Sequence, residues 1–232
     1  MESVIRIDHV WKQYHMGDAG PLIVLKDINL DIKKGEFVAI TGPSGSGKST
    51  MMHIIGVLDR PSQGDIFLKN RSISTMSKSE LAILRGKTIG FIFQQFNLFP
   101  TLSALENVAL PMEIINESED DALKRAEKLL VMLGLGDRMH HKPTELSGGQ
   151  QQRVAIARAL SNNPEVILAD EPTGNLDSKT GAFVMDFLGK LHKEEGKTVI
   201  LITHDLNLVK YAKRIIHIKD GSIIKDTKEE KK

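Results

Sequence analysis

Residues 41–50, TGPSGSGKST, combine the side chains and the spacing that bind phosphate. Gly42, Gly47, Lys48 and Ser49 satisfy the pattern G-x-x-x-x-G-K-[ST]. Its glycines let backbone N–H groups approach a phosphate chain, the lysine faces the β- and γ-phosphates, and the serine hydroxyl can ligate Mg²⁺. A plain Gly/Ser-rich turn is the alternative. We predict that a nucleoside triphosphate contacts Gly42, Pro43, Ser44, Gly45, Ser46, Gly47, Lys48, Ser49 and Thr50.

The segments around this loop predict a strand before it and a helix after it. Residues 37–40 are a short apolar run, and residues 50–55 have helical spacing. Two more apolar runs, 166–169 and 198–203, are typical of strands buried on both faces, which are parallel. Ligands of open α/β sheets bind beyond the carboxyl ends of such strands. We therefore expect the polar residues that follow the three runs to share one site.

Those polar residues suggest the chemistry of hydrolysis. Asp170 ends an apolar run, which is the position of the Walker B aspartate that holds Mg²⁺. Glu171 beside it suits a general base for the attacking water. Gln94 and His204 follow two other apolar runs and are predicted to sense the γ-phosphate and Mg²⁺. The metal ligands expected here are Ser49, Gln94 and Asp170.

The remaining segments predict an α/β chain with a helical insertion. The first 36 residues alternate like antiparallel strands around a loop over 14–21, and residues 95–163 are predominantly helical in pattern. Tyr14, at the start of that loop, could stack on a nucleobase or pack beside Trp11. The charged tail, residues 225–232, is predicted to fray.

Composition excludes several classes of protein. The net charge of the 232 residues is +1, which argues against a nucleic-acid partner, and the absence of cysteine excludes disulfides and thiolate metal sites. No apolar run approaches the ~20 residues of a spanning helix, and the start lacks the apolar region of a signal peptide. We expect a cytoplasmic chain that reaches the membrane only through a partner.

Residues 146–150, LSGGQ, give the most specific signal. Ser147 and Gln150 have the spacing of a capping box, and residues 151–160 continue as a helix. The N–H groups of Ser147, Gly148 and Gly149 would form a second anion site at that helix start. With the phosphate loop before it and Asp170 and Glu171 after it, the chain resembles the ATP-binding subunit of ABC transporters over essentially its whole length.

The resemblance implies the fold, the dimer and the residue roles. The fold is a P-loop parallel-sheet core, about residues 1–94 and 164–232, with an N-terminal antiparallel β subdomain and a helical subdomain, about 95–163, in one domain. The dimer is head-to-tail, with each ATP between residues 42–50 of one copy and 147–150 of the other. The implied roles are adenine stacking by Tyr14, membrane coupling through Gln94, catalysis by Lys48, Glu171 and His204, and second-site contacts by Ser147, Gly148, Gly149 and Gln150.

A narrower likeness concerns the group that serves macrolide export, lipoprotein release and cell division. It is carried by FQQFNLFP, LENVALP and DEPTGNLD, in which Asn175 is a mild departure from the usual D-loop. It implies an integral membrane permease-type partner, which we expect to dock near residues 94–112. A non-transporting regulatory ATPase, division-associated or clamp-like, is the alternative. A guanine-reading motif, which a GTPase would need, is absent, and a kinase has no use for LSGGQ.

Overall fold

The structure, a computed structural model, describes residues 2–15, 17 and 20–228. The chain divides into two compact units, residues 1–82 with 191–232 and residues 83–190. The expected division into a core and a helical subdomain over about 95–163 stays a prediction.

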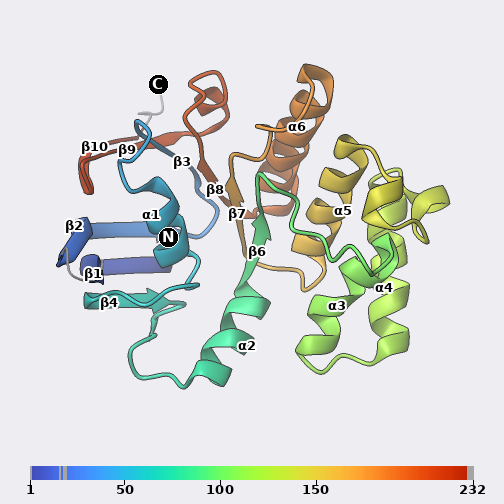
Figure 1. Ribbon diagram of the computed structural model, residues 1–232, viewed down its shortest axis with the longest axis horizontal. Coiled ribbons are helices and arrows are strands. Elements are labelled where there is room, and N and C mark those ends of the chain that lie inside the picture. The colour runs from blue at the N-terminus through green and yellow to red at the C-terminus, as the bar shows by residue number, and fades with distance from the viewer. Residues whose placement is uncertain (1, 16, 18–19, 229–232) are drawn as a thin grey trace. The chain divides into compact units, whose positions relative to one another are not determined.

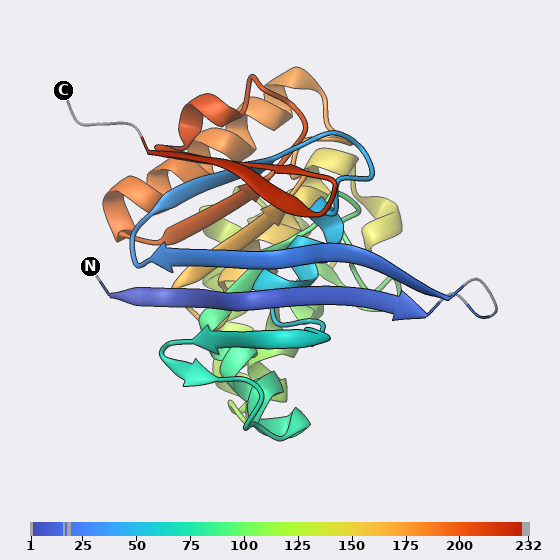
Figure 2. The ribbon, with the colours of Figure 1, turned by 90° about the vertical axis from the view of Figure 1, so that its left-hand side faces the viewer.

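The first unit contains an antiparallel sheet in the order β2-β1-β4-β5, whose long strands lie side by side in Figure 2. Its register sets apolar residues opposite each other, with Ile5 opposite Ile32 and Ile7 opposite Leu30. These four side chains are buried, and most of their neighbours along the strands are not, as the alternation in the sequence predicts; Val4, which is also buried, is the exception beside Ile5. The strands are β1 Ser3–His15, β2 Pro21–Lys33, β4 Gln63–Leu68 and β5 Arg71–Ser72.

A second group of strands in this unit runs in the order β10-β9-β3-β8. Strand β3 is parallel to both β8 and β9, and every residue of β3 and β8 is buried. The carboxyl ends of β3 and β8 therefore lie at the same edge, as predicted. The elements are β3 Phe37–Thr41, α1 Lys48–Ile55, β8 Thr198–Ile202, the 3₁₀ turn Val209–Tyr211, β9 Arg214–Lys219 and β10 Ser222–Lys228.

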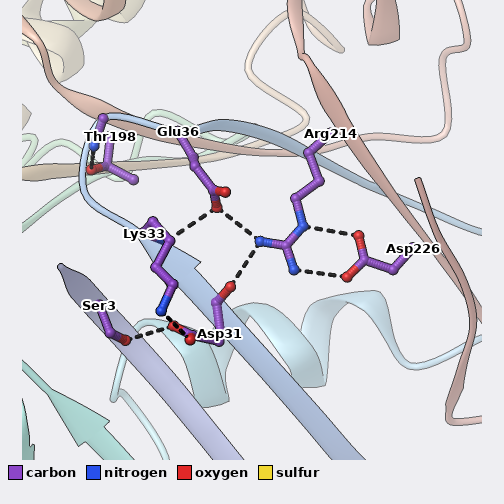
Figure 3. A network of polar contacts seen from close by, with 8 residues as sticks. Ser3, Asp31, Lys33, Glu36, Thr198, Arg214 and Asp226 are labelled. Carbon is purple, nitrogen blue, oxygen red and sulfur yellow. Dashed lines mark hydrogen bonds and ion pairs between the residues drawn. The ribbon is translucent and has the colours of Figure 1, made fainter. Parts of the chain in front are cut away.

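The prediction of a fraying tail is wrong for residues 225–228. They belong to β10, which pairs with β9. Asp226 receives two hydrogen bonds from the guanidinium of Arg214, at 2.9 and 2.7 Å, and Arg214 also donates to Glu36 and to the Asp31 carbonyl, both at 2.8 Å (Figure 3). A buried cation thus holds a strand that its composition alone would leave in solvent. Residues 229–232 lie outside the described residues.

The N-terminal loop is shorter than predicted. Tyr14 and His15 belong to β1 and pair with Leu22 and Pro21 of β2. The strands therefore extend into the segment that its Gly and Pro content suggested was irregular, because the backbone hydrogen bonds of the hairpin outweigh the local composition. Residues 16, 18 and 19, which fall in that predicted loop, lie outside the described residues.

The second unit contains a parallel pair of strands, β6 and β7, and a group of helices in which α3, α4 and α5 pack together (Figure 1). Serine side chains cap these three helices, at Ser103, Ser118 and Ser147. The elements are β6 Ile89–Ile92, α3 Ala104–Ile114, α4 Glu119–Met132, the 3₁₀ turns Gly136–Arg138 and Pro143–Glu145, α5 Gly148–Leu160 and β7 Val166–Asp170.

Two helices cross the boundary between the units along the chain, α2 Lys78–Thr88 and α6 Ser178–Glu195. Helix α2 begins after Ser77, whose hydroxyl donates to Glu80 at 2.7 Å. Over the described part of the chain, we find no helix with the length and apolar character needed to cross a bilayer.

Candidate active site

The phosphate loop of the first unit joins the end of β3 to the start of α1, as predicted. Gly47 caps α1 with a φ of 100°, and Gly45 has a φ of 77°. Only glycine adopts such angles freely. At Gly42 the constraint is space, since a Cβ there would lie 2.2 Å from the carbonyl oxygen of Ile218. The loop needs glycine at these three positions for two different physical reasons.

Two polar side chains of the loop show how it would hold phosphate. Lys48 Nζ donates to the carbonyl oxygens of Gly42 and Pro43, at 2.8 and 2.9 Å, so the ammonium group lies across the loop. The Ser46 hydroxyl is buried and has no hydrogen-bond partner in the described part of the chain. Buried hydroxyls without a partner are uncommon. Together with the N–H groups of the first turn of α1, which have no partner within the helix, these groups suit an anion.

Tyr14 and His204 complete the predicted residues of the first unit. Tyr14 is half-buried, and its hydroxyl donates to Asp59 Oδ2 at 3.1 Å. Burial makes the largest contribution and raises the pKa of this phenol, and Asp59 raises it further. A hydrogen bond with the Thr50 side chain lowers this pKa. His204 is exposed just beyond β8, and the Thr203 N–H donates to the Ile40 carbonyl at 3.1 Å. The phosphate loop and His204 thus leave adjacent parallel strands.

In the second unit, Gln94 meets the turn that follows β7. Asp170 ends β7, and Glu171 has a φ of 43°, an uncommon conformation for a residue with a side chain. A Cβ on Gly174 would lie 2.7 Å from Gln94 Nε2, so the glutamine packs directly on this turn. The Asn175 amide also donates to the Gln94 carbonyl at 3.0 Å. The mild departure at Asn175 therefore contributes a contact.

The LSGGQ segment begins α5 in the same unit. Ser147 and Gln150 form the predicted capping box, with the Ser147 N–H donating to Gln150 Oε1 at 2.8 Å. A Cβ on Gly149 would lie 2.9 Å from Thr180 Cγ2. The buried Gln152 amide donates to the Pro172 carbonyl at 2.7 Å. This ties the helix to the turn after β7.

The expected magnesium ligands have suitable chemistry. In the described ranges, 2–15, 17 and 20–228, no group of three or more His, Cys, Asp or Glu side chains could hold a metal. The predicted set instead has a hydroxyl (Ser49), an amide (Gln94) and one carboxylate (Asp170). These are hard oxygen donors, and Mg²⁺ is typically bound by one or two carboxylates together with substrate phosphates. The residues fit this metal.

Comparison with known proteins decides the family. A family model described as "ABC transporter" matches residues 25–174. An uncharacterised ABC transporter ATP-binding protein of Methanocaldococcus jannaschii is 56% identical over 95% of this chain and 98% of its own length. The chain belongs to the ABC transporter family. The predicted identity, an ATP-binding subunit with ATPase activity and an α/β cassette fold, is confirmed.

A solved structure gives a close match to this ABC cassette. It is a dimer of MJ0796, also from M. jannaschii, in a post-hydrolysis state bound to ADP and Pi. Its TM-score is 0.90 at 50% identity, and the match covers 98% of this chain and 100% of that one. The macrolide export ATP-binding/permease protein MacB of a Shewanella strain is 51% identical over 99% of this chain. This chain spans 35% of MacB.

The two units of the ABC cassette hold different parts of the predicted site. The first brings Tyr14 to Thr50 and sets the phosphate loop beside His204. The second brings Gln94, the turn after β7 and the start of α5 together. Lys12 and Asp59, which contact Tyr14, were not among the residues predicted from the sequence. One signal was available, because Lys12 and Tyr14 are two apart on a strand and share a face.

Proposed function

We propose that this chain hydrolyses ATP with Mg²⁺ at two composite sites of a head-to-tail homodimer, and that hydrolysis drives an integral membrane partner. The observation that carries the proposal is that each unit holds a helix start suited to an anion, α1 behind Gly47 and α5 behind Ser147. A single ATP bound to the phosphate loop leaves the second helix start available for another copy. The MJ0796 cassette, which is dimeric, supports this arrangement.

Within each composite site, the residues divide the work. Lys48 and the loop N–H groups bind the β- and γ-phosphates, and Ser49, Gln94 and Asp170 would hold Mg²⁺. When bound, Mg²⁺ neutralises charge on these phosphates. Glu171 accepts a proton from the attacking water, and His204 lies against the γ-phosphate. The unusual backbone angle of Glu171 supports its role, because strained residues concentrate at functional sites.

The second copy completes the site with residues 147–150. The first N–H groups of α5 have no partner within the helix, and the Ser147 hydroxyl already accepts from Gln150 N at 3.3 Å. The Gly148 and Gly149 positions expose backbone that can approach the γ-phosphate closely. ATP then joins the two copies, and hydrolysis separates them.

The membrane partner docks on the second unit near residues 94–112. There the surface has a shallow groove of 430 Å³. It is lined by Gln95, Phe96, Asn97, Leu98, Pro100, Pro143, Thr144, Gln151 and Asn175. Phe99, which lies between the lining residues Leu98 and Pro100 in the sequence, is 51% exposed. A groove lined by both apolar and polar side chains, with an exposed aromatic residue beside it in the chain, suits a short amphipathic helix.

The partner places the ATPase at the cytoplasmic face of the membrane as a peripheral subunit. MacB, an export ATP-binding/permease protein, supports a permease partner and export or mechanical work over a regulatory clamp.

The proposal is tested by separating the two anion sites. Lys48→Ala weakens ATP binding to the monomer, because the lysine contacts ATP before the copies meet. Ser147→Arg leaves monomer binding intact and abolishes ATP-dependent dimerisation. Calorimetry and light scattering measure the two properties, and a thermal melt checks that Ser147→Arg, which also removes a helix cap, stays folded. Equal loss of monomer binding in both variants would contradict the head-to-tail dimer.

A further inference from the structure

Tyr14 lies beside two charged side chains, Lys12 and Asp59, that have no role in the proposed reaction. Lys12 precedes it by two residues on β1 and is only 9% exposed. Lysine is almost never buried unless its charge has a partner. Here the ammonium group donates to Asp59 Oδ2 at 2.8 Å and to the Arg60 carbonyl at 2.9 Å. The cation is therefore held in place by the segment that follows α1.

Asp59 connects this lysine to the tyrosine. Its Oδ2 accepts from both Lys12 and the Tyr14 hydroxyl, and its Oδ1 accepts from the Arg60 N–H at 2.8 Å. Burial alone raises the pKa of the Asp59 carboxyl, but the bonds from Lys12, Tyr14 and Arg60 outweigh it and hold that pKa below its ordinary value. The carboxylate stays charged at neutral pH and is fixed by three donors.

These contacts fix both the position and the face of the ring. The hydroxyl donates to Asp59, so rotation of the side chain breaks this hydrogen bond. Lys12 Nζ lies 4.8 Å from the ring centroid, over one face. A base stacking on Tyr14 must therefore use the opposite face.

We propose that Lys12 and Asp59 are positioning residues that hold the Tyr14 ring ready to stack on the adenine of ATP. This inference rests on the proposed function, in which Tyr14 is the stacking residue. A side chain that is already immobile loses less freedom when the base arrives, and such ordering is worth about three- to tenfold in affinity. Because the pair acts only on the base, the affinity for the phosphates does not change.

The test compares two probes that share phosphates but not a base. The affinities of ATP and inorganic tripolyphosphate for the monomer are measured by calorimetry for wild type, Asp59→Asn, Tyr14→Phe and the double variant, and for Tyr14→Ala, which removes the ring itself. Asp59→Asn and Tyr14→Phe each weaken ATP binding about three- to tenfold and leave tripolyphosphate unchanged. The double variant is no weaker than either single one, because both changes remove the same contact. Asp65→Asn, a carboxylate of β4 bonded to Ser72, is the matched control and changes neither affinity.

A second variant removes the risk of misfolding. Asp59→Asn leaves the buried Lys12 without its carboxylate, so Lys12→Met combined with Asp59→Asn, which takes away both charges, is measured in parallel. It should give the same selective loss for ATP.

The outcomes separate this inference from the proposed function. A wild-type chain that does not bind ATP overturns both. Tyr14→Ala without effect on ATP affinity removes the stacking role and the inference with it, while the phosphate loop is unaffected. An Asp59→Asn variant that loses ATP and tripolyphosphate equally, or whose effect adds to that of Tyr14→Phe, overturns the inference alone.

Discussion

Glu171 occupies a backbone conformation that local sequence does not favour. Its φ of 43° follows directly on the buried strand β7, and its carbonyl accepts from the Gly174 N–H at 3.0 Å. The tight turn so formed carries the glutamate out of the strand direction. Such an angle persists only where surrounding contacts hold it.

We expect Glu171→Gln to lower the rate of ATP hydrolysis at least ~100-fold, because the amide cannot accept the proton of water. ATP binding survives, since the shape of the side chain is kept. Steady-state turnover and equilibrium binding measure the two effects. Glu127→Gln, an exposed position on α4, is the matched control. Near-normal hydrolysis by Glu171→Gln would show that this residue is not the base.

Acid should unfold the protein through Asp31 and Asp59. Burial raises the pKa of each carboxyl, but hydrogen bonds from Lys33 and Ser3 to Asp31, and from Lys12 and Tyr14 to Asp59, lower both on balance. A lowered pKa in the folded state adds stability above the unfolded value of about 3.9. That stability is lost as pH falls through the folded values.

Urea unfolding therefore gives a constant free energy of unfolding from about pH 7 to pH 5 and a falling one below about pH 4. In the Lys12→Met, Asp59→Asn variant the decline is shallower. A free energy that rises on acidification would contradict this assignment of the ionised carboxylates.

Among the elements, β10 is held by a charged contact in addition to its pairing with β9. Arg214, whose side chain is 8% exposed, bonds Asp226 of β10 and Glu36 before β3 (Figure 3). The hydrogen bonds that the guanidinium donates to Asp226 raise the pKa of Arg214, with burial acting against them. The strand is therefore attached to the rest of its unit by charge as well as by backbone pairing.

Asp226→Asn should lower the free energy of unfolding by about 1–2 kcal/mol, less than a fully buried ion pair because the aspartate is partly exposed. Urea unfolding measures the change. Asp220→Asn is the control, because this residue of the β9–β10 turn has a φ of 48°, which asparagine also tolerates. An equal effect of the two substitutions would show that the Arg214 contact adds nothing.

The loop before α3 presents its aromatic residue outward. The Phe99 N–H donates to the buried side chain of Asn107 at 2.7 Å, and the Phe99 carbonyl accepts from it at 3.1 Å, while Phe99 as a whole is 51% exposed. Asn107 thus fixes the backbone and leaves the ring available to a partner.

We expect Phe99→Asp to keep the fold and the ATPase activity of the isolated subunit and to prevent its association with the membrane partner. Co-purification from membranes, together with a thermal melt and an ATPase assay, measures this. Asn107→Ala is the comparison variant. Unlike Phe99→Asp, it removes the buried hydrogen bonds and should lower the free energy of unfolding. Loss of fold in Phe99→Asp would place the ring in the core instead.

At the scale of the whole molecule, the sequence predicted those features that depend on residues close together in the chain. The buried strands β3, β7 and β8 were evident as apolar runs, and the loop at residues 42–50 followed from glycine, lysine and serine spacing. The predicted ends of elements were wrong where a residue of another element holds the segment, as Arg214 of β9 holds β10. Tyr14 and Asp59 are 45 residues apart, and no periodic pattern in the sequence predicts their hydrogen bond. The catalytic and metal roles stay predictions.

The central claim is that each ATP is shared between two copies of the chain. It is tested most directly by mixing two inactive variants, Lys48→Ala and Ser147→Arg, and measuring ATP hydrolysis. A mixed dimer has one site with an intact phosphate loop from the Ser147→Arg chain and an intact α5 start from the Lys48→Ala chain. We predict that the mixture hydrolyses ATP well above the sum of the separate variants, with a maximum near equal amounts. Activity that stays at that sum at every ratio would contradict the shared site.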